Sequence, residues 1–220
     1  MGLVKRFTAS DLPRARNNER MRPINLIVIH CSASPNADSL FRGKAGAANF
    51  QNPAQVIDDW HFAPPKSFRR PAAWRAKQNP SLRSIGYHYV IGRDGTVFTG
   101  RHVDEIPAQV TGFNQKAIGI CLIGIDQFSP AQWSSLAHVV TAEVARITGR
   151  NGPTDRNNPL TPAGAIRLAG ERGLVICGHR DLSPDQNKNG IVEPFEWLKT
   201  CPGFDVSTWL GNNMTPEAPQ

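Results

Sequence analysis

The chain has 220 residues, of which 40% are hydrophobic and 20% charged, a length and balance that fit one soluble globular domain. No apolar run approaches the roughly 20 residues of a membrane-spanning helix, so we expect no membrane anchor. The formal net charge of +7 favours anionic partners, but no nucleic-acid-binding motif accompanies it, so we expect no nucleic-acid partner.

The predicted elements alternate between strands and helices. In chain order they are a strand at 24–30, a helix at 53–61, a hairpin of strands at 86–92 and 96–100, a strand at 118–124, a helix at 129–148, a short helix from 161, a strand at 174–178 and a short helix at 205–210. The predicted fold class is therefore α/β, a single domain with a central mixed β-sheet flanked by helices. We expect this domain at 23–211, after a basic leader at 1–22 without the apolar part of a secretory signal, and before a flexible tail at 212–220.

The clearest helix is the one predicted at 129–148. Ser129 and Gln132 can form a capping box around its first turn, where Pro130 also fits. Gly149 can end it. One apolar stripe is expected to enter the core: Trp133, Leu136, Val139, Val140, Val144 and Ile147. The helix at 53–61 is expected to place three apolar residues on one side: Val56, Ile57 and Trp60.

The segment at 63–84 contains six basic residues and no acidic residue: Lys66, Arg69, Arg70, Arg75, Lys77 and Arg83. A solvated surface loop is the simpler interpretation of such a run. The alternative is a positively charged contact surface for the substrate or for outer-membrane lipid.

The four cysteines form an even number, which is compatible with disulfides. Because Cys31, Cys121 and Cys177 lie in or beside apolar strands and no export signal is seen, reduced buried thiols are favoured instead. Cys201 differs, since it lies in a turn, Lys-Thr-Cys-Pro-Gly, where a structural thiol has less to pack against.

Two histidines end apolar strands, and Cys201 completes a candidate metal site with them. His30 and His179 lie where a sheet presents polar groups to solvent, although a lone histidine there is usually only a satisfied polar group. Two histidines and one cysteine match the three protein ligands of a catalytic zinc site, which leaves one position open. The long spacing does not prove the site by itself.

Alternation along a strand assigns directions to the neighbouring side chains. If His30 faces a site, Cys31 should face the core behind it. By the same rule, His88 should point away from a face shared by Tyr87 and Tyr89.

Six segments occur in an order that resembles a known family. They are Ile-Val-Ile-His-Cys-Ser-Ala at 27–33, Gly-Tyr-His-Tyr-Val-Ile at 86–91, Arg-Asp-Gly-Thr-Val at 93–97, Gly-Phe-Asn-Gln-Lys-Ala-Ile-Gly-Ile-Cys-Leu-Ile-Gly at 112–124, Gly-His-Arg-Asp at 178–181 and Lys-Thr-Cys-Pro-Gly-Phe-Asp at 199–205. Together they resemble the type 2 N-acetylmuramoyl-L-alanine amidases, in particular the short phage lysozyme-like endolysins. The family also includes the peptidoglycan recognition proteins.

This resemblance implies a peptidoglycan hydrolase that cleaves the amide between N-acetylmuramic acid and L-alanine with zinc-activated water. His30, His179 and Cys201 match the zinc ligands of the family. Tyr87 matches its catalytic tyrosine, which would orient water or assist proton transfer. Lys199 matches its catalytic lysine, which would stabilise the developing oxyanion. The residue pattern alone does not choose Tyr87 over Tyr89.

Two polar residues are expected to contact substrate. Gln109 stands where family members often carry a histidine near the substrate groove, and it can donate or accept a hydrogen bond but cannot act as a cation. Asn114 is the second candidate. The loops at 34–53 and 63–84 and the stretch at 150–172 look longer than in the smallest family members, and we expect them to shape the groove.

Residues 185–196 fit the EF-hand calcium loop at every diagnostic position. The candidate ligands are the side chains of Asp185, Asn187, Asn189 and Glu196 and the carbonyl of Ile191, with Glu193 acting through water and Gly190 at the sharp turn. The simpler interpretation is an Asn/Gly turn that needs no ion. Because the loop joins His179 to Cys201, its order would help to place Lys199 and Cys201.

Two alternatives to the endolysin hypothesis stay open. A non-catalytic peptidoglycan-binding protein would usually lack the cysteine ligand, and a cytoplasmic muropeptide-recycling amidase usually has Asp where Cys201 stands. We expect a monomer that binds peptidoglycan, stays in the host cytoplasm before release, and then acts on the cell wall in the periplasm. Some phage amidases also bind RNA polymerase, but no residue here indicates it.

Overall fold

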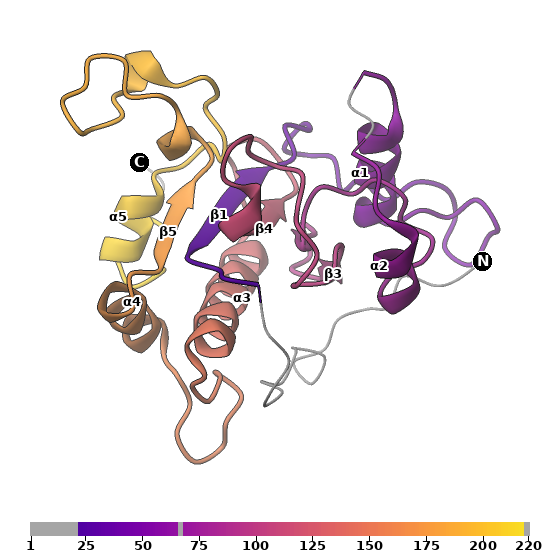
Figure 1. Ribbon diagram of the computed structural model, residues 1–220. Helices are drawn as coiled ribbons and strands as arrows, with labels where there is room; N and C mark the ends of the chain where they lie inside the picture. The colour runs from indigo at the N-terminus through magenta and orange to yellow at the C-terminus, as the bar shows by residue number, and fades with distance from the viewer. Residues whose placement is uncertain (1–21, 66–67, 218–220) are drawn as a thin grey trace.

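The computed structural model describes residues 22–65 and 68–217, and five strands form its sheet (Figure 1): β1 Leu26–Cys31, β2 Tyr89–Ile91, β3 Val97–Thr99, β4 Ala117–Leu122 and β5 Val175–Gly178. Their order across the sheet is β3-β2-β4-β1-β5. Strand β3 pairs antiparallel with β2, and the other pairings are parallel. The mixed sheet within one α/β domain is confirmed.

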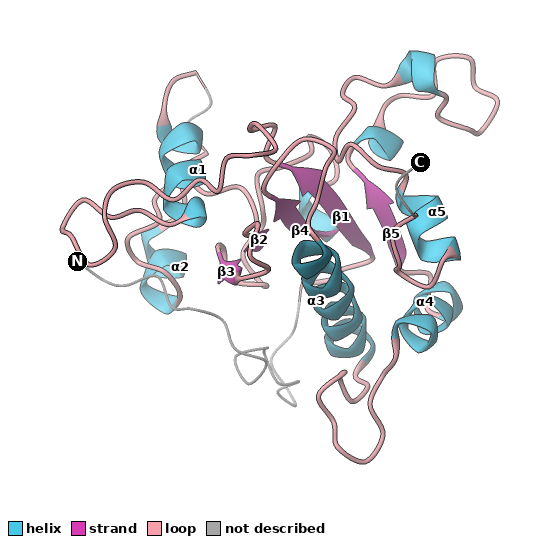
Figure 2. Cartoon of the chain, turned by 180° about the vertical axis from the view of Figure 1, so that it is seen from behind, coloured by secondary structure: helices cyan, strands magenta, loops and turns pink. Residues whose placement is uncertain are grey.

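The described chain has five α-helices: α1 Pro53–Phe62, α2 Ala72–Lys77, α3 Pro130–Thr148, α4 Pro162–Glu171 and α5 Val206–Gly211. Helix α3 runs along one face of the sheet, with α4 and α5 near β5, while α1 and α2 lie towards β3 (Figures 1 and 2). The predicted helices are all present, and α2 is an additional one inside the segment predicted as a basic loop. No helix among the described residues is long and apolar enough to cross a membrane.

Helix α3 forms for the local reasons that its sequence indicates. The side chain of Ser129 accepts from the Gln132 N–H, and the side-chain oxygen of Gln132 accepts from the Ser129 N–H. Gly149 ends the helix at φ 70°, a left-handed conformation that glycine adopts without strain. The apolar stripe packs on the sheet as expected, and its most buried members are Leu136, Val139, Val140 and Val144.

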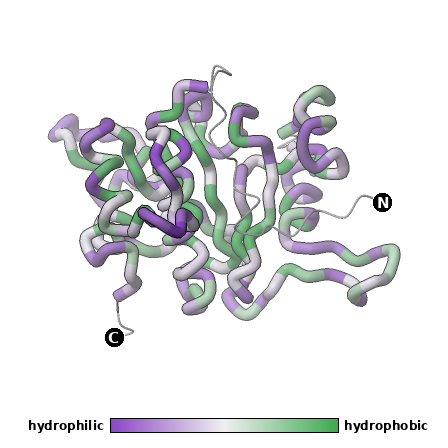
Figure 3. Tube along the Cα trace, turned by 90° about the horizontal axis from the view of Figure 1, so that it is seen from below, coloured by the Kyte–Doolittle hydropathy of each residue, from purple (hydrophilic) through white to green (hydrophobic). Residues whose placement is uncertain are grey.

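The sheet separates two layers of apolar side chains, and the strands are the most hydrophobic part of the trace (Figure 3). Ile27 and Ile29 of β1 pack with α3, whereas Leu26 and Val28 belong to a cluster on the other side. Alternation therefore turns His30, the next residue along β1, away from α3.

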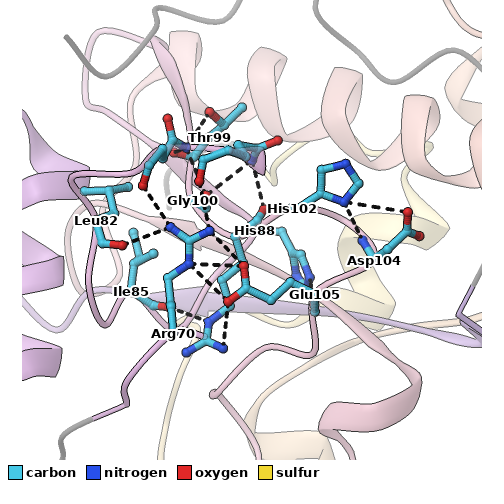
Figure 4. A network of polar contacts seen from close by, with 12 residues as sticks. Arg70, Leu82, Ile85, His88, Thr99, Gly100, His102, Asp104 and Glu105 are labelled. Carbon is cyan, nitrogen blue, oxygen red and sulfur yellow. Dashed lines mark hydrogen bonds and ion pairs between the residues drawn. The ribbon is translucent and has the colours of Figure 1, made fainter. Parts of the chain in front are cut away.

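A buried ion-pair network joins the basic segment at 63–84 to the segment that follows β3 (Figure 4). The Arg70 guanidinium lies 2.8 Å from the Glu105 carboxylate and also donates to the carbonyl oxygens of Asn79 and Leu82. Arg101 approaches the same carboxylate at 3.2 Å. Arg70 is only 5% exposed, so the prediction of a solvated loop is wrong for this residue.

The same network reaches the centre of the sheet through His88 (Figure 4). Its Nδ1 accepts from the Gly119 N–H at 3.0 Å, so Nε2 carries the proton and donates to the Glu105 carbonyl oxygen at 2.9 Å. Burial lowers the pKa of His88 well below its usual value, which keeps the ring neutral in this role.

Several details differ from the sequence predictions. Trp60 is 40% exposed and does not share the buried side of Val56 and Ile57. In the predicted tail, Met214 is buried in the core, so the packed chain extends past the expected boundary at 211. Arg22, the only described residue of the predicted leader, donates to the carbonyl oxygens of Val103 and Ala117. The remainder of the leader and residues 218–220 lie outside the described residues.

Candidate metal centre

Parallel pairing brings the two candidate histidines to one edge of the sheet. Ile29 of β1 stands opposite Gly178 of β5, and the His179 N–H donates to the Ile29 carbonyl oxygen at 3.1 Å. His30 and His179 therefore leave adjacent strands at their carboxyl ends, with ring centroids 4.7 Å apart.

Cys201 reaches this edge from a separate turn. The Arg180 N–H donates to the Cys201 carbonyl oxygen at 2.9 Å, which holds the turn against the residue after His179. Gly178 allows this approach, because a Cβ there would lie 2.6 Å from Pro202 Cδ. The Cys201 Sγ lies 3.7 Å from His30 Nδ1, and one ligand atom from each of His30, His179 and Cys201 lies within 4.8 Å of the others. The three predicted zinc ligands are thus brought together.

The electrostatics of the site suit a metal ion. Burial, and then the charge of Lys199, lower the pKa of His179 to about 4. Burial and the neighbouring His179 lower the pKa of His30 well below its usual value. Both rings are therefore neutral near pH 7, which is the form that binds metal. Two imidazoles and a thiolate are ligands that zinc prefers, so the residues present fit this ion.

Cys31 does not face the core as predicted. Its N–H donates to Cys201 Sγ at 3.2 Å, a contact that supports a thiolate. The two cysteines are coupled: their contact lowers the pKa of Cys31 to about 7 and raises the pKa of Cys201. A metal ion would reverse this for Cys201, because a coordinating thiol is deprotonated. The two residues meet because Cys31 is the last residue of β1, where the Cys201 turn wraps around the strand end.

Tyr87, and not Tyr89, lies at the metal centre. The Tyr87 ring packs 5.0 Å from His30 between ring centroids, and burial raises the pKa of its hydroxyl well above the usual value. Tyr89 lies in the α3 cluster and donates to Glu143 at 2.7 Å. The prediction that the two tyrosines share one face is therefore wrong. Strand β2 begins only at Tyr89, so Tyr87 precedes the strand and strand alternation does not fix its direction.

Lys199 is exposed and precedes Cys201 by two positions. After the larger effect of burial, its charge contributes to the lowered pKa of His179, and it also contributes to that of His30. Its catalytic role stays a prediction.

His61 is a residue of the site that the sequence did not reveal. It lies in the last turn of α1, and its ring centroid is 5.3 Å from that of Tyr87. Its Nδ1 accepts from the Gly86 N–H at 3.0 Å, which fixes the backbone immediately before Tyr87. No motif marks His61, because its role depends on a tertiary contact.

The predicted substrate residues have other contacts in this structure. Asn114 begins a 3₁₀ turn, Asn114–Lys116, and its side-chain oxygen accepts from the backbone N–H groups of Gln109 and Val110. Both amide atoms of Gln109 are buried. Direct contacts of Gln109 and Asn114 with substrate stay predictions, and the buried amide of Gln109 indicates a different role, argued below.

Residues 185–196 form a loop in which the predicted calcium-ligand residues bond to the backbone of the loop itself. Glu196 is buried and accepts from the backbone N–H groups of Gln186, Asn187 and Glu193. These bonds lower the pKa of Glu196, and the bond from the Glu193 N–H has the largest effect. Asp185 Oδ2 accepts from the Gly190 N–H at 2.8 Å. The side-chain oxygen of Asn187 accepts from the Asn189 N–H, and that of Asn189 accepts from the Ile191 N–H.

Fold and site together define an α/β protein that carries two histidines and a cysteine at one edge of its sheet, a ligand set that could hold a metal ion. The profile of the N-acetylmuramoyl-L-alanine amidase family matches residues 20–204, and the chain belongs to this family. The family membership predicted from the six segments is thereby confirmed.

Several known proteins are similar to this chain. An uncharacterized protein of Haemophilus influenzae is 39% identical over 129 residues, which cover 55% of this chain and 90% of that protein. The endolysin of Enterobacteria phage K11 is 26% identical over 83% of this chain and 82% of its own length. For the endolysin of Escherichia phage T7 the identity is 28%, over 59% of this chain and 66% of the endolysin. Among solved structures, the N-acetylmuramoyl-L-alanine amidase LysC from Clostridium intestinale URNW is 18% identical with a TM-score of 0.49, and the match covers 87% of this chain and 85% of LysC.

Proposed function

We propose that this protein is a zinc-dependent N-acetylmuramoyl-L-alanine amidase that acts as a phage endolysin on peptidoglycan. The observation that carries the proposal is the convergence of His30, His179 and Cys201, whose ligand atoms lie within 4.8 Å of one another beside Tyr87. Family membership and the similarity to phage endolysins support the choice of substrate. The presence of Cys201 favours an enzyme over a non-catalytic binding protein.

Zinc at such a site lowers the pKa of a bound water and polarises a carbonyl. The residues of the chain supply the remaining functions. The neutral imidazoles of His30 and His179 and the thiolate of Cys201 hold the ion. The ammonium group of Lys199 would stabilise the negative charge that develops on the amide oxygen. Tyr87, held between His30 and His61, orients the attacking water through its hydroxyl.

The products of digested cell walls test the proposed function. Purified protein incubated with intact sacculi should release stem peptides that begin with a free L-alanine amino group, without new reducing sugar ends. Mass spectrometry of the digest and zinc quantification of the protein provide both readouts. If only soluble anhydromuropeptides are cleaved, the recycling alternative holds. Binding to sacculi without release of peptides would indicate the non-catalytic alternative.

Exchange of Lys199 for methionine should lower kcat by about 100-fold or more, because one stabilising group for the oxyanion is lost. Tyr87→Phe should lower kcat by a similar factor of about 100 through the loss of its hydroxyl. Zinc content should stay at the wild-type level in both variants, since neither residue is a ligand. Lys188→Met, at an exposed position that is not among the proposed calcium ligands, is the matched control and should keep full activity. A normal kcat in Lys199→Met would contradict the assigned role.

We also propose that the loop at 185–196 binds calcium. The support is the full register of the motif, together with Asp185 Oδ1, a buried oxygen without a hydrogen-bond partner among the described residues. Ligation of calcium would engage this oxygen and order the connection between His179 and Cys201. The site would be structural, because the flanking segments are not paired EF-hand helices.

Calcium should raise the melting temperature of the zinc-loaded protein. At 100 times Kd, a ligand that binds only the folded state adds about 2.7 kcal/mol, which is a shift of several degrees for a chain of this size. Differential scanning calorimetry with added calcium, and with magnesium as the control ion, measures it. Asp185→Asn should weaken the calcium response. Identical melting temperatures with and without calcium would show that the loop is a plain turn.

The place of action follows from the endolysin proposal. The protein would accumulate in the host cytoplasm and reach the cell wall on release. Exposed basic residues near α2, including Arg69, Lys77 and Arg83, would then attract the anionic wall.

A further inference from the structure

His30 presents two different environments to its two ring nitrogens. Nδ1 lies 3.7 Å from Cys201 Sγ and thus faces the other ligands. Nε2 is buried and has no hydrogen-bond partner among the described residues. A buried polar group without a partner costs about 1–3 kcal/mol, and a metal-bound histidine almost always donates its second N–H to an acceptor. The site therefore calls for an acceptor near Nε2.

Gln109 is the side chain that can supply this acceptor. Both of its amide atoms are buried, and neither forms a regular hydrogen bond within the described chain. The amide lies over Gly119 of β4, which pairs with Val28, two residues before His30 and therefore on the same face of β1. Burial lowers the pKa of His30, and Gln109 acts in the opposite direction, as a nearby acceptor would. If Nδ1 offers its lone pair to a metal, Nε2 carries the proton, and only the Oε1 atom of Gln109 can accept it.

Gly119, in the middle of β4, provides the space for this amide. A Cβ at Gly119 would lie 1.7 Å from Gln109 Oε1 and 2.5 Å from its Cδ, so the side chain passes directly over the glycine. The backbone of Gly119 is held in turn by its N–H bond to His88. Any larger residue at 119 would force the amide away from its place on the sheet.

The backbone of Gln109 is fixed on both sides. Asn114 Oδ1 accepts from the Gln109 N–H and from the Val110 N–H, each at 3.0 Å. On the other side, the Ala108 N–H donates to the Gly86 carbonyl oxygen at 3.0 Å, next to Tyr87. These bonds hold the residue rigidly before any substrate arrives, as expected of a group that orients a ligand.

We propose that Gln109 is a positioning residue for the metal centre: its Oε1 accepts the Nε2–H of His30 and directs Nδ1 towards the zinc ion. Asn114 supports Gln109 by fixing its backbone, and Gly119 leaves room for its amide. The inference rests on the proposed zinc site and deepens it. It also replaces a direct substrate contact for Gln109, because atoms that are buried cannot reach a wall polymer without rearrangement.

Zinc affinity tests the proposal directly. Gln109→Leu keeps the size of the side chain but removes the acceptor, so zinc should bind about 10–100-fold more weakly in competition with a chromophoric chelator. Gln109→Glu keeps an acceptor and should bind zinc at least as tightly as the wild type. Gln115→Leu, at an exposed glutamine in the same segment, is the matched control and should leave the zinc Kd unchanged. The visible spectrum of the cobalt-substituted protein should change in Gln109→Leu only.

Gly119 offers an independent check through a double-mutant cycle. Gly119→Ala alone should weaken zinc binding as much as Gln109→Ala does, because the added methyl group displaces the amide. In the Gln109→Ala background the space is empty, so Gly119→Ala should cost no further zinc affinity. Additive losses would contradict the proposed contact.

The outcomes separate this inference from the proposed function. If the wild type binds zinc stoichiometrically but Gln109→Leu binds it equally tightly and only KM for sacculi rises, Gln109 is a substrate residue and the inference is wrong, while the amidase proposal stands. If Gln109→Leu binds zinc weakly, the inference stands. If the zinc-loaded wild type nevertheless releases no L-alanine-terminated peptides from sacculi, the proposed function is wrong. A wild type without zinc would overturn both.

Discussion

Cys201→Ser should remove bound zinc and lower wall-lytic activity by well over about 100-fold, beyond the loss that outer contacts of a metal site produce. The serine hydroxyl has nearly the same size, but it does not ionise near pH 7 and is a poor zinc ligand. The Cys31 N–H, which donates to Cys201 Sγ at 3.2 Å, would face a neutral hydroxyl in place of a thiolate. His30 and His179 alone provide only two ligands, too few for the three that catalytic zinc sites use.

The control for this prediction is Cys177→Ser, a second buried thiol in β5. Burial raises the pKa of Cys177 to about 12, so it stays protonated and has no ligand role. Cys177→Ser should keep one zinc per chain and most of the activity, although stability can fall. Zinc quantification and lysis of sacculi measure both variants. Full zinc content in Cys201→Ser would contradict the ligand assignment.

Local signals made most of the fold predictable. Helix α3 follows from its own caps and stripe, because Ser129, Gln132 and Gly149 act within one turn of the helix ends. The grouping of the candidate zinc ligands was predictable for a related reason, since parallel strands carry the residues after them to one edge of the sheet. His30 and His179 needed only that rule and the family resemblance.

Contacts between distant segments were not predictable in this way. The contact between the Cys201 sulfur and the Cys31 backbone depends on how one turn wraps around the end of β1, which strand alternation does not describe. The direction of Tyr87 was not predictable because it lies two residues before β2, which begins at Tyr89, so strand alternation does not apply to it. His61 approaches Tyr87 only because α1 packs at this side of the sheet. Such features arise from packing, for which a single sequence carries no local signal.

The basic segment at 63–84 shows that charge composition alone does not predict which cations are buried. Composition predicts six similar solvated cations between 63 and 84, but Arg70 is buried against Glu105 while its neighbour Arg69 is exposed. What separates them is a carboxylate that lies 35 positions along the chain from Arg70. The consequence is a large difference in their expected contributions to stability.

Arg70→Met should lower the free energy of unfolding by about 3–5 kcal/mol, because removal of one partner leaves the other charge buried. The Glu105 side chain is 2% exposed and would keep only Arg101, at 3.2 Å. The carbonyl oxygens of Asn79 and Leu82 would lose their donor as well. Urea unfolding, followed by circular dichroism, measures the change.

Arg69→Met is the matched control, since this exposed guanidinium only stacks on Phe62 at 5.0 Å and should cost less than about 1 kcal/mol. In the double variant Arg70→Met/Glu105→Leu the buried charge is gone, so the loss should be smaller than for Arg70→Met alone. Equal stability of Arg70→Met and Arg69→Met would refute the prediction.

The same network reaches the space that the Gln109 side chain occupies. The Glu105 carbonyl oxygen accepts from His88, and His88 accepts from the N–H of Gly119, over which the Gln109 amide lies. A weakened network should therefore also loosen the position of that amide. Arg70→Met should therefore lose zinc at a lower urea concentration than the wild type, which links the stability of the basic segment to the metal centre.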